Sequence, residues 1–373
     1  MRYKLGDICS RLSSGKGISA KLISSTGNFP VYGGNGLRGY TEKSNFAGEC
    51  AIIGRQGAFC GNVRFFSGEA YMTEHAVVVC ADENNDTRYL AYLLGAMNLG
   101  RLSGQSAQPG LSVKVLAQQE IDMPSLEQQK KVSSILALIE DKIELNNKIN
   151  KNLEQQAQEL FKAWFVTFEA FGGKMPSFWN VAKLGDIAAI KTNSFSPTKN
   201  PTVMLEHYSI PAFDEQKYPV FELASNVKSN KYILTNNSVM ISKLNPDTKR
   251  VWRPICISAF AVSSTEFIIF EANDPTYKDF VFSVIDSAAF SDWMCAHTTG
   301  STNSRQRTTP STTLEFQIAL PNHEVVSDFC KIVTPMYDMI AQNTCENRKL
   351  SAFRDSLLPK LMSGELDVSN LDL

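Results

Sequence analysis

The chain of 373 residues carries a short sequence pattern twice, and this duplication constrains its fold more than any other feature. Leu5-Gly6-Asp7-Ile8 returns as Leu184-Gly185-Asp186-Ile187. Met123-Pro124 precedes a long amphipathic stretch and Leu320-Pro321 precedes another, so that Pro321 lies 197 residues after Pro124. The repeat predicts two similar domains, each followed by a long helix. A molecule with two similar working ends suits a target that has two half-sites.

Residues 1–124 have the pattern of an irregular, β-rich α+β domain. Short apolar runs such as Cys50–Gly54 and His75–Cys80 are separated by turn residues, which is typical of short strands. Arg88–Leu99 carries leucines at helical spacing, which predicts a helix packed on that sheet. The whole chain is long enough for two or three separate cores.

Residues 125–167 change in composition, because glycine and proline disappear and Gln, Glu, Lys, Asn and Leu become frequent. Ser125 followed by Gln128 predicts a capping box at the start of a helix. A seam of residues at a spacing of seven predicts that this helix pairs with another one. The seam residues are Val132, Ile139, Asn146, Leu153 and Leu160.

Residues 168–183 form a glycine- and proline-containing connector, and residues 184–321 resemble the first domain in kind. The runs Val239–Ser242 and Glu266–Phe270 predict strands, and Thr276–Trp293 predicts an amphipathic helix. The offset between the domains grows from 179 at Leu184 to 197 at Pro321, so the second domain is the longer one.

Residues 322–365 form the second long helix, followed by a short tail, 366–373. Each of its seam residues lies 197 residues after a seam residue of the first helix, and they are Phe329, Met336, Asn343, Leu350 and Leu357. One interpretation of the two asparagines is that they are buried and fix the helix register at a cost in stability. The other interpretation is that they lie on an edge of the helix that faces water. The position of the Asn residues does not set the direction of pairing. One domain before each helix favours an antiparallel pair, with Asn146 close to Asn343.

The bulk composition, with 43% hydrophobic and 20% charged residues, is that of an ordinary soluble protein. No apolar run is long enough to cross a bilayer, and the first residues show no signal region. The eight cysteines are scattered without Cys-x-x-Cys spacing, which predicts reduced thiols in a cytoplasmic protein and no metal site. The net charge of −1 argues neither for nor against a nucleic-acid partner.

A search for catalytic motifs yields no constellation. Gly34–Gly39 matches a dinucleotide-binding fingerprint in letters, but no helical pattern follows it, so a turn is the better prediction. Asn245-Pro246-Asp247-Thr248 lacks the second proline and the aromatic ring of an adenine methyltransferase motif. The histidines stand apart from any nucleophile pattern. The sequence therefore predicts a non-catalytic chain without a cofactor of its own.

Basic and amide side chains gather in turn-rich segments of both domains. Arg101–Lys114 and Thr298–Thr313 contain no acid, and each precedes a proline-helix junction. Such side chains hold phosphates and read base edges, although a solvated loop is the alternative for any single residue. The candidate DNA contacts are Arg38, Lys43, Arg55, Gln56, Arg64, Gln105, Gln108, Lys243, Lys249, Arg250, Arg253, Arg305 and Arg307.

The segments at the ends of each repeat resemble the specificity (S) subunit of type I restriction-modification systems, and the resemblance covers essentially the whole chain. Gln108–Ser112 with Ile121–Pro124 is similar to the start of that family's central conserved region, and Leu153–Phe165 is similar to its end. Thr299–Thr302 and Arg354–Leu366 resemble the loop and the C-terminal signature of the second copy. Thr302–Arg307 is an irregular version of that loop.

The resemblance implies two target recognition domains separated by two long helices that pack as an antiparallel coiled coil, in a pseudo-two-fold repeat. Each domain would read one half of a bipartite, asymmetric double-stranded DNA site in phage defence. The helices would set the gap and carry two methyltransferase (M) subunits and the restriction (R) subunits. S-adenosylmethionine, ATP and Mg would bind to those partners. About 35 helical residues span roughly 50 Å, which accommodates half-sites one DNA turn, about 34–36 Å, apart.

Two other functions stay open on the sequence alone. The chain could be the DNA-recognition subunit of a related phage-defence or orphan methyltransferase complex, because the same scaffold would serve. It could also be a coiled-coil adaptor that binds only protein. An autonomous nuclease or methyltransferase is disfavoured by the missing motifs.

Overall fold

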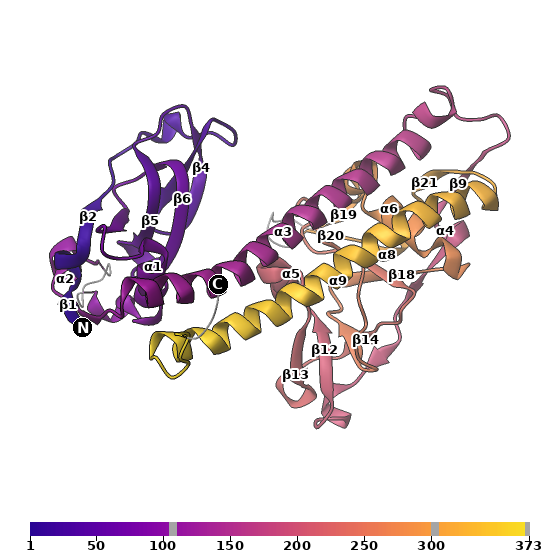
Figure 1. The fold of residues 1–373 in the computed structure, drawn as a ribbon. Coiled ribbons are helices and arrows are strands. Elements are labelled where there is room, and N and C mark those ends of the chain that lie inside the picture. Colours follow the sequence, from indigo (N-terminus) through magenta and orange to yellow (C-terminus); the bar gives the residue numbers. More distant parts are fainter. Residues whose placement is uncertain (104–109, 300–305, 370–373) are drawn as a thin grey trace. The chain divides into compact units, whose positions relative to one another are not determined.

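The computed structural model describes residues 1–103, 110–299 and 306–369. The chain divides into two compact units (Figure 1). Unit 1 consists of Met1–Glu144 with Asn347–Leu373, and unit 2 consists of Leu145–Glu346. Each long helix contributes one part to each unit, so each unit is described by itself.

Unit 1 contains one large sheet and one two-stranded sheet. Its strands are β1 (Arg2–Lys4), β2 (Cys9–Ser14), β3 (Phe29–Gly33), β4 (Gly36–Thr41), β5 (Phe46–Gly54), β6 (Val63–Met72), β7 (Ala76–Ala81) and β8 (Glu120–Asp122). Its helices are η1 (Leu5–Ile8), η2 (Ala20–Leu22), η3 (Gly57–Phe59), α1 (Thr87–Ala96), η4 (Leu99–Leu102), α2 (Val113–Ala117), the first part of α3 (Leu126–Phe165) and the last part of α9 (His323–Met362).

The large sheet of unit 1 has the strand order β2-β7-β5-β6-β3-β4. β7 is apolar throughout because both faces of the sheet are covered. Val77 and Val79 pack with Leu90 of α1 in one hydrophobic cluster, and Val78 packs with Ile52 in another. α1 starts where the Asp86 carboxylate accepts a hydrogen bond from Tyr89 N at 2.6 Å. The predicted strands and helix of this domain are confirmed.

Unit 2 contains two larger sheets. Its strands are β9 (Asn180–Lys183), β10 (Ala188–Lys191), β11 (Ser194–Phe195), β12 (Met204–Tyr208), β13 (Val220–Leu223), β14 (Lys231–Ile233), β15 (Ser238–Ser242), β16 (Val251–Trp252), β17 (Ala261–Ser263), β18 (Phe267–Ala272), β19 (Thr298–Thr299), β20 (Arg307–Thr308) and β21 (Gln317–Leu320). Its helices are η5 (Glu169–Phe171), α4 (Leu184–Ile187), η6 (Pro197–Lys199), α5 (Ile210–Gln216), η7 (Ala224–Asn226), η8 (Pro275–Tyr277), α6 (Lys278–Ile285), α7 (Ala288–Ala296), α8 (Pro310–Thr313) and α9 (His323–Met362).

The two sheets of unit 2 have the orders β10-β18-β15-β16 and β11-β14-β17-β12-β13. The single helix predicted over Thr276–Trp293 is wrong, because the structure has α6 and α7 there. The Ser287 hydroxyl accepts a hydrogen bond from Phe290 N at 3.2 Å and caps a new helix. A serine that caps a helix start competes with continuation of the helix before it, which the apolar spacing alone does not reveal.

A pair of short strands next to each long helix, which we call the frame, has the same register in both units. In unit 1, β1 pairs antiparallel with β8 and places Tyr3 opposite Ile121. In unit 2, β9 pairs antiparallel with β21 and places Ala182 opposite Ile318. These partners are related by the same two sequence offsets, 179 and 197, that the duplicated motifs show. The last residues of the predicted connector therefore form β9, and the two-part repeat extends to individual strand pairs.

The two repeated glycines serve the same purpose in both frames. A Cβ at Gly6 would lie 3.1 Å from Cβ of Ala117, and a Cβ at Gly185 would lie 3.2 Å from Cβ of Leu314. Ala117 and Leu314 again differ by 197 in sequence number. The Leu-Gly-Asp-Ile motif is thus repeated because its turn packs directly on the segment before each long helix.

Within unit 2, α3 and α9 lie side by side and run antiparallel (Figure 1). Near its end α3 places Phe161 against Phe329 at the start of α9, with ring centroids 6.1 Å apart. Asn146 Nδ2 donates to Glu346 Oε2 at 2.7 Å, and Asn343 Nδ2 donates to the Asn150 side-chain oxygen at 2.8 Å. Asn146 and Asn343 are both buried and lie within one helical turn of each other along the pair. The predicted antiparallel direction is confirmed.

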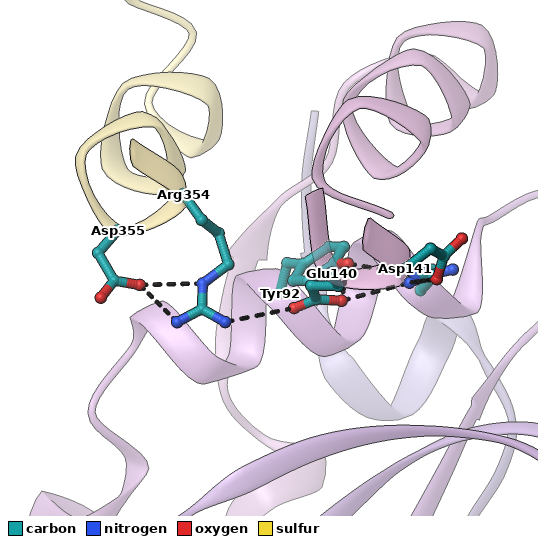
Figure 2. Close-up of polar contacts among 6 residues, drawn as sticks. Tyr92, Glu140, Asp141, Arg354 and Asp355 are labelled. Atoms are coloured by element: carbon teal, nitrogen blue, oxygen red, sulfur yellow. Dashed lines mark hydrogen bonds and ion pairs between the residues drawn. The ribbon is translucent and has the colours of Figure 1, made fainter. Parts of the chain in front are cut away.

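Within unit 1, the other parts of the same helices also meet. Figure 2 shows Arg354 of α9 and Glu140 of α3, whose charged atoms are 4.0 Å apart. Glu140 also accepts hydrogen bonds from the Tyr92 hydroxyl and from Arg88 of α1. This network links both long helices to α1. The predicted capping box is present too, since Gln128 N donates to Ser125 Oγ and Ser125 N donates to Gln128 Oε1, both at 3.4 Å.

The predicted seam residues all lie on α3 or α9 and are buried or half-buried. The buried ones are Val132, Ile139, Asn146, Phe329 and Asn343, and the half-buried ones are Leu153, Leu160, Met336, Leu350 and Leu357.

Replacing both seam asparagines, Asn146→Leu with Asn343→Leu, is expected to raise the thermal stability of unit 2 and to loosen the helix register. A buried amide costs stability, whereas its hydrogen bonds favour one alignment. A photocrosslinker at Gln342 should label α3 within one turn of Lys151 in the parent protein and over a wider range in the double variant. Leu153→Met, a matched apolar change on the seam, should alter neither property. The same narrow labelling in parent and double variant would contradict the register role.

Candidate nucleic-acid interface

Two of the predicted DNA contacts, Arg55 and Gln56, directly follow β5. The carbonyl oxygen of Arg55 accepts a hydrogen bond from Leu111 N at 2.9 Å, and Gln56 forms an isolated β-bridge with Gly110. Arg55 N donates to His75 O at 3.0 Å, and its Nη1 lies 3.4 Å from Ser14 Oγ. The end of β5 is thereby fixed against the segment that begins at Gly110.

The turn between β3 and β4, Gly33-Gly34-Asn35-Gly36, brings two more candidates to the same place. A Cβ at Gly33 would lie 2.7 Å from Arg38 Cδ, and a Cβ at Gly36 would lie 3.1 Å from Arg64 Cζ. A Cβ at Gly34 would lie 3.5 Å from Arg55 N. Gly36 is favoured by its φ of +96°, which other residues rarely adopt, and at Gly34 a Cβ would lie 3.0 Å from the carbonyl oxygen of His75. We name Arg38, Arg55 and Arg64 around this turn the arginine rim.

The turn at Gly34–Gly39, predicted in place of a dinucleotide-binding loop, is confirmed. β3 and β4 pair antiparallel with Gly33 opposite Gly36, so Gly34 and Asn35 connect two strands of a hairpin. No strand-to-helix step exists there, and a pyrophosphate would find no helix N-terminus to bind.

The remaining candidates of the first domain lie elsewhere. Lys43 is exposed beyond Thr41, at the opposite end of β4 from the arginine rim. Gln105 and Gln108 lie outside the described residues.

Unit 2 contains an equivalent of the main-chain contact between the end of β5 and the segment that begins at Gly110. Lys243 follows β15, and its carbonyl oxygen accepts a hydrogen bond from Thr308 N at 3.0 Å. Leu244 bridges Arg307, and Asn245 N donates to Gln306 O at 2.9 Å. Each unit thus joins the end of one central strand to the segment before its long helix. Arg305 lies outside the described residues.

The other candidates of unit 2 form ion pairs within that unit. Arg250 binds both carboxylate oxygens of Asp214, at 2.6 and 2.9 Å. Arg307 binds Glu266 in the same two-point manner at 3.0 and 3.2 Å. Lys249 lies 2.7 Å from an Asp286 oxygen. Such pairing lowers the positive charge that these side chains present to a ligand.

Arg253 forms ion pairs with two helices of unit 2 and is largely buried. Its guanidinium binds both oxygens of Asp279 on α6, at 2.7 and 3.2 Å, and reaches Asp338 on α9 at 2.8 Å. The Asp279 side chain is 4% exposed and the Arg253 side chain 14% exposed. Arg253 therefore ties the loop after β16 to two helices, and little of its side chain is left for a ligand to contact.

Exposed side chains near the arginine rim were missed by the sequence interpretation. Leu37, 51% exposed, lies between Gly36 and Arg38, and Phe59, 41% exposed, follows β5 in η3. Asn35 and Asn62 are exposed as well. Apolar groups can contact a thymine methyl group and amides can read adenine. The only signal in the sequence is an apolar residue placed inside a glycine- and arginine-rich turn.

The thiols of Cys9 and Cys50 pack in the hydrophobic clusters of unit 1. Burial raises the pKa of Cys9 and Cys50 to about 12, so both stay protonated at neutral pH and are poor nucleophiles. Among the described residues, no group of His, Cys, Asp and Glu side chains could hold a metal ion. The same residues include no helix long and apolar enough for a membrane span.

Comparison with known proteins finds similarity to type I specificity subunits. The sequence model of the type I restriction modification DNA specificity domain matches residues 1–155. The type I restriction enzyme EcoprrI specificity subunit of Escherichia coli is 41% identical over 139 residues, which are 36% of this chain and 34% of that protein. The type I restriction enzyme MjaIX specificity subunit of Methanocaldococcus jannaschii is 27% identical over 317 residues, covering 76% of this chain and 70% of that protein.

Residues 1–155 thus match the type I DNA specificity domain, and the chain is similar to type I specificity subunits over most of its length. The crystal structure of the type I restriction-modification S subunit from M. genitalium is similar over 97% of this chain and 95% of that one, with a TM-score of 0.70 and 16% identity. At that identity the likeness shows a shared fold. The match to the E. coli relative spans about a third of that protein's length. As in the sequence prediction, the chain combines β-rich domains with two long helices.

Proposed function

We propose that this chain is the specificity subunit, the non-catalytic DNA-recognition component, of a type I restriction-modification complex. Each β-rich domain reads one half of a bipartite, asymmetric DNA site. One observation carries the proposal. The strand pair beside each long helix, β1 with β8 and β9 with β21, repeats in register, whereas the side chains near the ends of β5 and β15 differ between the domains. Equal frames with unequal reading surfaces suit two different half-sites better than a palindrome.

The proposed domain limits follow the repeat. The first target recognition domain comprises residues 1–124 and the second comprises 184–321. The spacer helices comprise 125–167 and 322–365, and their pairing sets the gap between half-sites.

The spacer helices also dock the partner subunits. Exposed apolar side chains lie on both helices, and such groups are unfavourable in water unless a partner covers them. In unit 2 they are Leu145, Ile149, Ile332 and Met339. In unit 1 they are Leu138 and Phe353. Two methyltransferase subunits and the restriction subunits are the proposed occupants, with S-adenosylmethionine, ATP and Mg bound to them, in the cytoplasm.

Tight DNA binding requires the complex. The net charge of −1 gives the isolated chain little electrostatic attraction to a duplex. We therefore expect weak binding by this chain alone and strong, sequence-specific binding when the methyltransferase subunits enclose the duplex.

Exchange of residues 1–124 for another recognition domain is expected to change one half of the methylated sequence and leave the other half and the gap unaltered. The reason is that the repeated frame and both helices remain. Methylome sequencing of a host that expresses the chain with its methyltransferase subunits measures the outcome. The reciprocal exchange of residues 184–321 is the matched control, and it should change the other half. A change in both halves after either exchange would refute the two-reader arrangement.

Two alternatives make different predictions. A DNA-recognition subunit of an orphan methyltransferase or related phage-defence complex would methylate a bipartite site but never restrict unmodified phage. A protein-only coiled-coil adaptor would shift no duplex in a gel, with or without partner subunits.

A further inference from the structure

We infer that the two recognition domains bind DNA with unequal electrostatics, and that the arginine rim of unit 1 supplies the phosphate contacts. In unit 2 the candidate cations near the equivalent main-chain contact, where the end of β15 meets the segment before α9, stabilise the domain itself. This inference rests on the proposed DNA-recognition function and assigns the charge-dependent part of it to one domain.

The rim of unit 1 presents charge that nothing else in the described structure neutralises. Arg38 and Arg64 are exposed, and neither forms an ion pair with a described residue. Their side chains pass beside Gly33 and Gly36, where the lack of a Cβ leaves room for them. The fork of N–H donors on each exposed guanidinium matches a phosphate.

The equivalent surface of unit 2 has the opposite arrangement. Arg250, Arg307 and Lys249 each face a carboxylate within 3.0 Å. A phosphate that recruited one of them would have to displace that carboxylate or approach it closely. Displacement exchanges one anion for another, so few counterions of DNA are released and little affinity is gained. Among the described candidate cations of this domain, Lys243 is the one that forms no ion pair.

The sequence could not separate these two cases, because the partners are distant along the chain. Arg250 and Asp214 are 36 residues apart, and Arg307 and Glu266 are 41 apart. Within Lys243–Arg253 the sequence contains a single acidic residue, Asp247, beside four basic ones. The fold brings the carboxylates of Asp214 and Glu266 next to these basic residues.

The test uses the full chain with its methyltransferase subunits and a fluorescent duplex of random sequence, since phosphate contacts need no target sequence. The logarithm of affinity falls with the logarithm of salt concentration by about 0.9 per phosphate contact. Arg38→Gln with Arg64→Gln is expected to reduce that slope by about 2. Between 50 and 200 mM salt the variant should therefore lose about tenfold less affinity than the parent.

The matched control is Lys249→Gln with Arg250→Gln, which removes the same number of positive charges from unit 2. Its slope should equal that of the parent. An equal reduction in both variants, a reduction in the control alone, or no reduction in the rim variant would each overturn the inference. If the parent complex binds no duplex at any salt concentration, the proposed function itself fails. Circular dichroism and thermal melting of each variant verify that the fold is retained.

Discussion

Arg253→Met is expected to destabilise unit 2 by about 3–5 kcal/mol, because it leaves the Asp279 carboxylate buried without its counter-charge. Asp279 is 3% exposed, and without Arg253 its carboxylate would retain, among the described hydrogen bonds, the one from Thr334 Oγ1 at 2.6 Å. The four tryptophans of the chain, Trp164, Trp179, Trp252 and Trp293, all lie in unit 2. Urea unfolding followed by tryptophan fluorescence therefore reports on this unit.

Two further variants separate charge burial from simple loss of contact. Arg250→Met breaks an ion pair whose Asp214 side chain is 45% exposed, and it should cost less than about 1 kcal/mol. Arg253→Met combined with Asp279→Leu should recover most of the lost stability, since no buried charge remains. A cost below about 1 kcal/mol for Arg253→Met alone would show that this ion pair does not hold the loop to α6 and α9.

Phe329→Ala is expected to destabilise unit 2 by about 3–5 kcal/mol, through lost burial and the cavity left behind. Phe329 is fully buried, and its ring centroid lies 5.0 Å from that of Phe165, 5.9 Å from that of Trp164 and 6.2 Å from that of Phe280. Its removal opens the junction of both helices with α6. The tryptophan-detected urea midpoint should fall, with an unchanged slope.

The repeat supplies the control for this experiment. Val132 occupies the matching seam position in unit 1, and Val132→Ala removes two methylene equivalents for roughly 2 kcal/mol. It should leave the tryptophan-detected transition nearly unchanged if the units unfold separately. Equal shifts in both variants would show that the two units unfold as one.

The sequence predicted the frame well because the frame is local and repeated. Seam spacing, the capping box at Ser125 and the strand-rich domains all follow from patterns within a few residues. The break between α6 and α7 was missed, since apolar spacing continues across Ser287 while the hydroxyl caps a new helix. The roles of the basic residues were not separable for a different reason. Arg38 and Arg253 look alike in sequence, and only the folded position of Asp279 distinguishes them.

The antiparallel pairing of β1 with β8 places the first and last residues of the first β-rich domain next to each other, and the pairing of β9 with β21 does the same for the residues just before the second domain and the end of that domain. A segment with adjacent ends can be replaced by recombination at two short junctions, and the path of the helix that follows does not change. If each domain reads one half-site as proposed, one such exchange would replace a whole reading surface, and a new DNA specificity would arise without any change in the other domain.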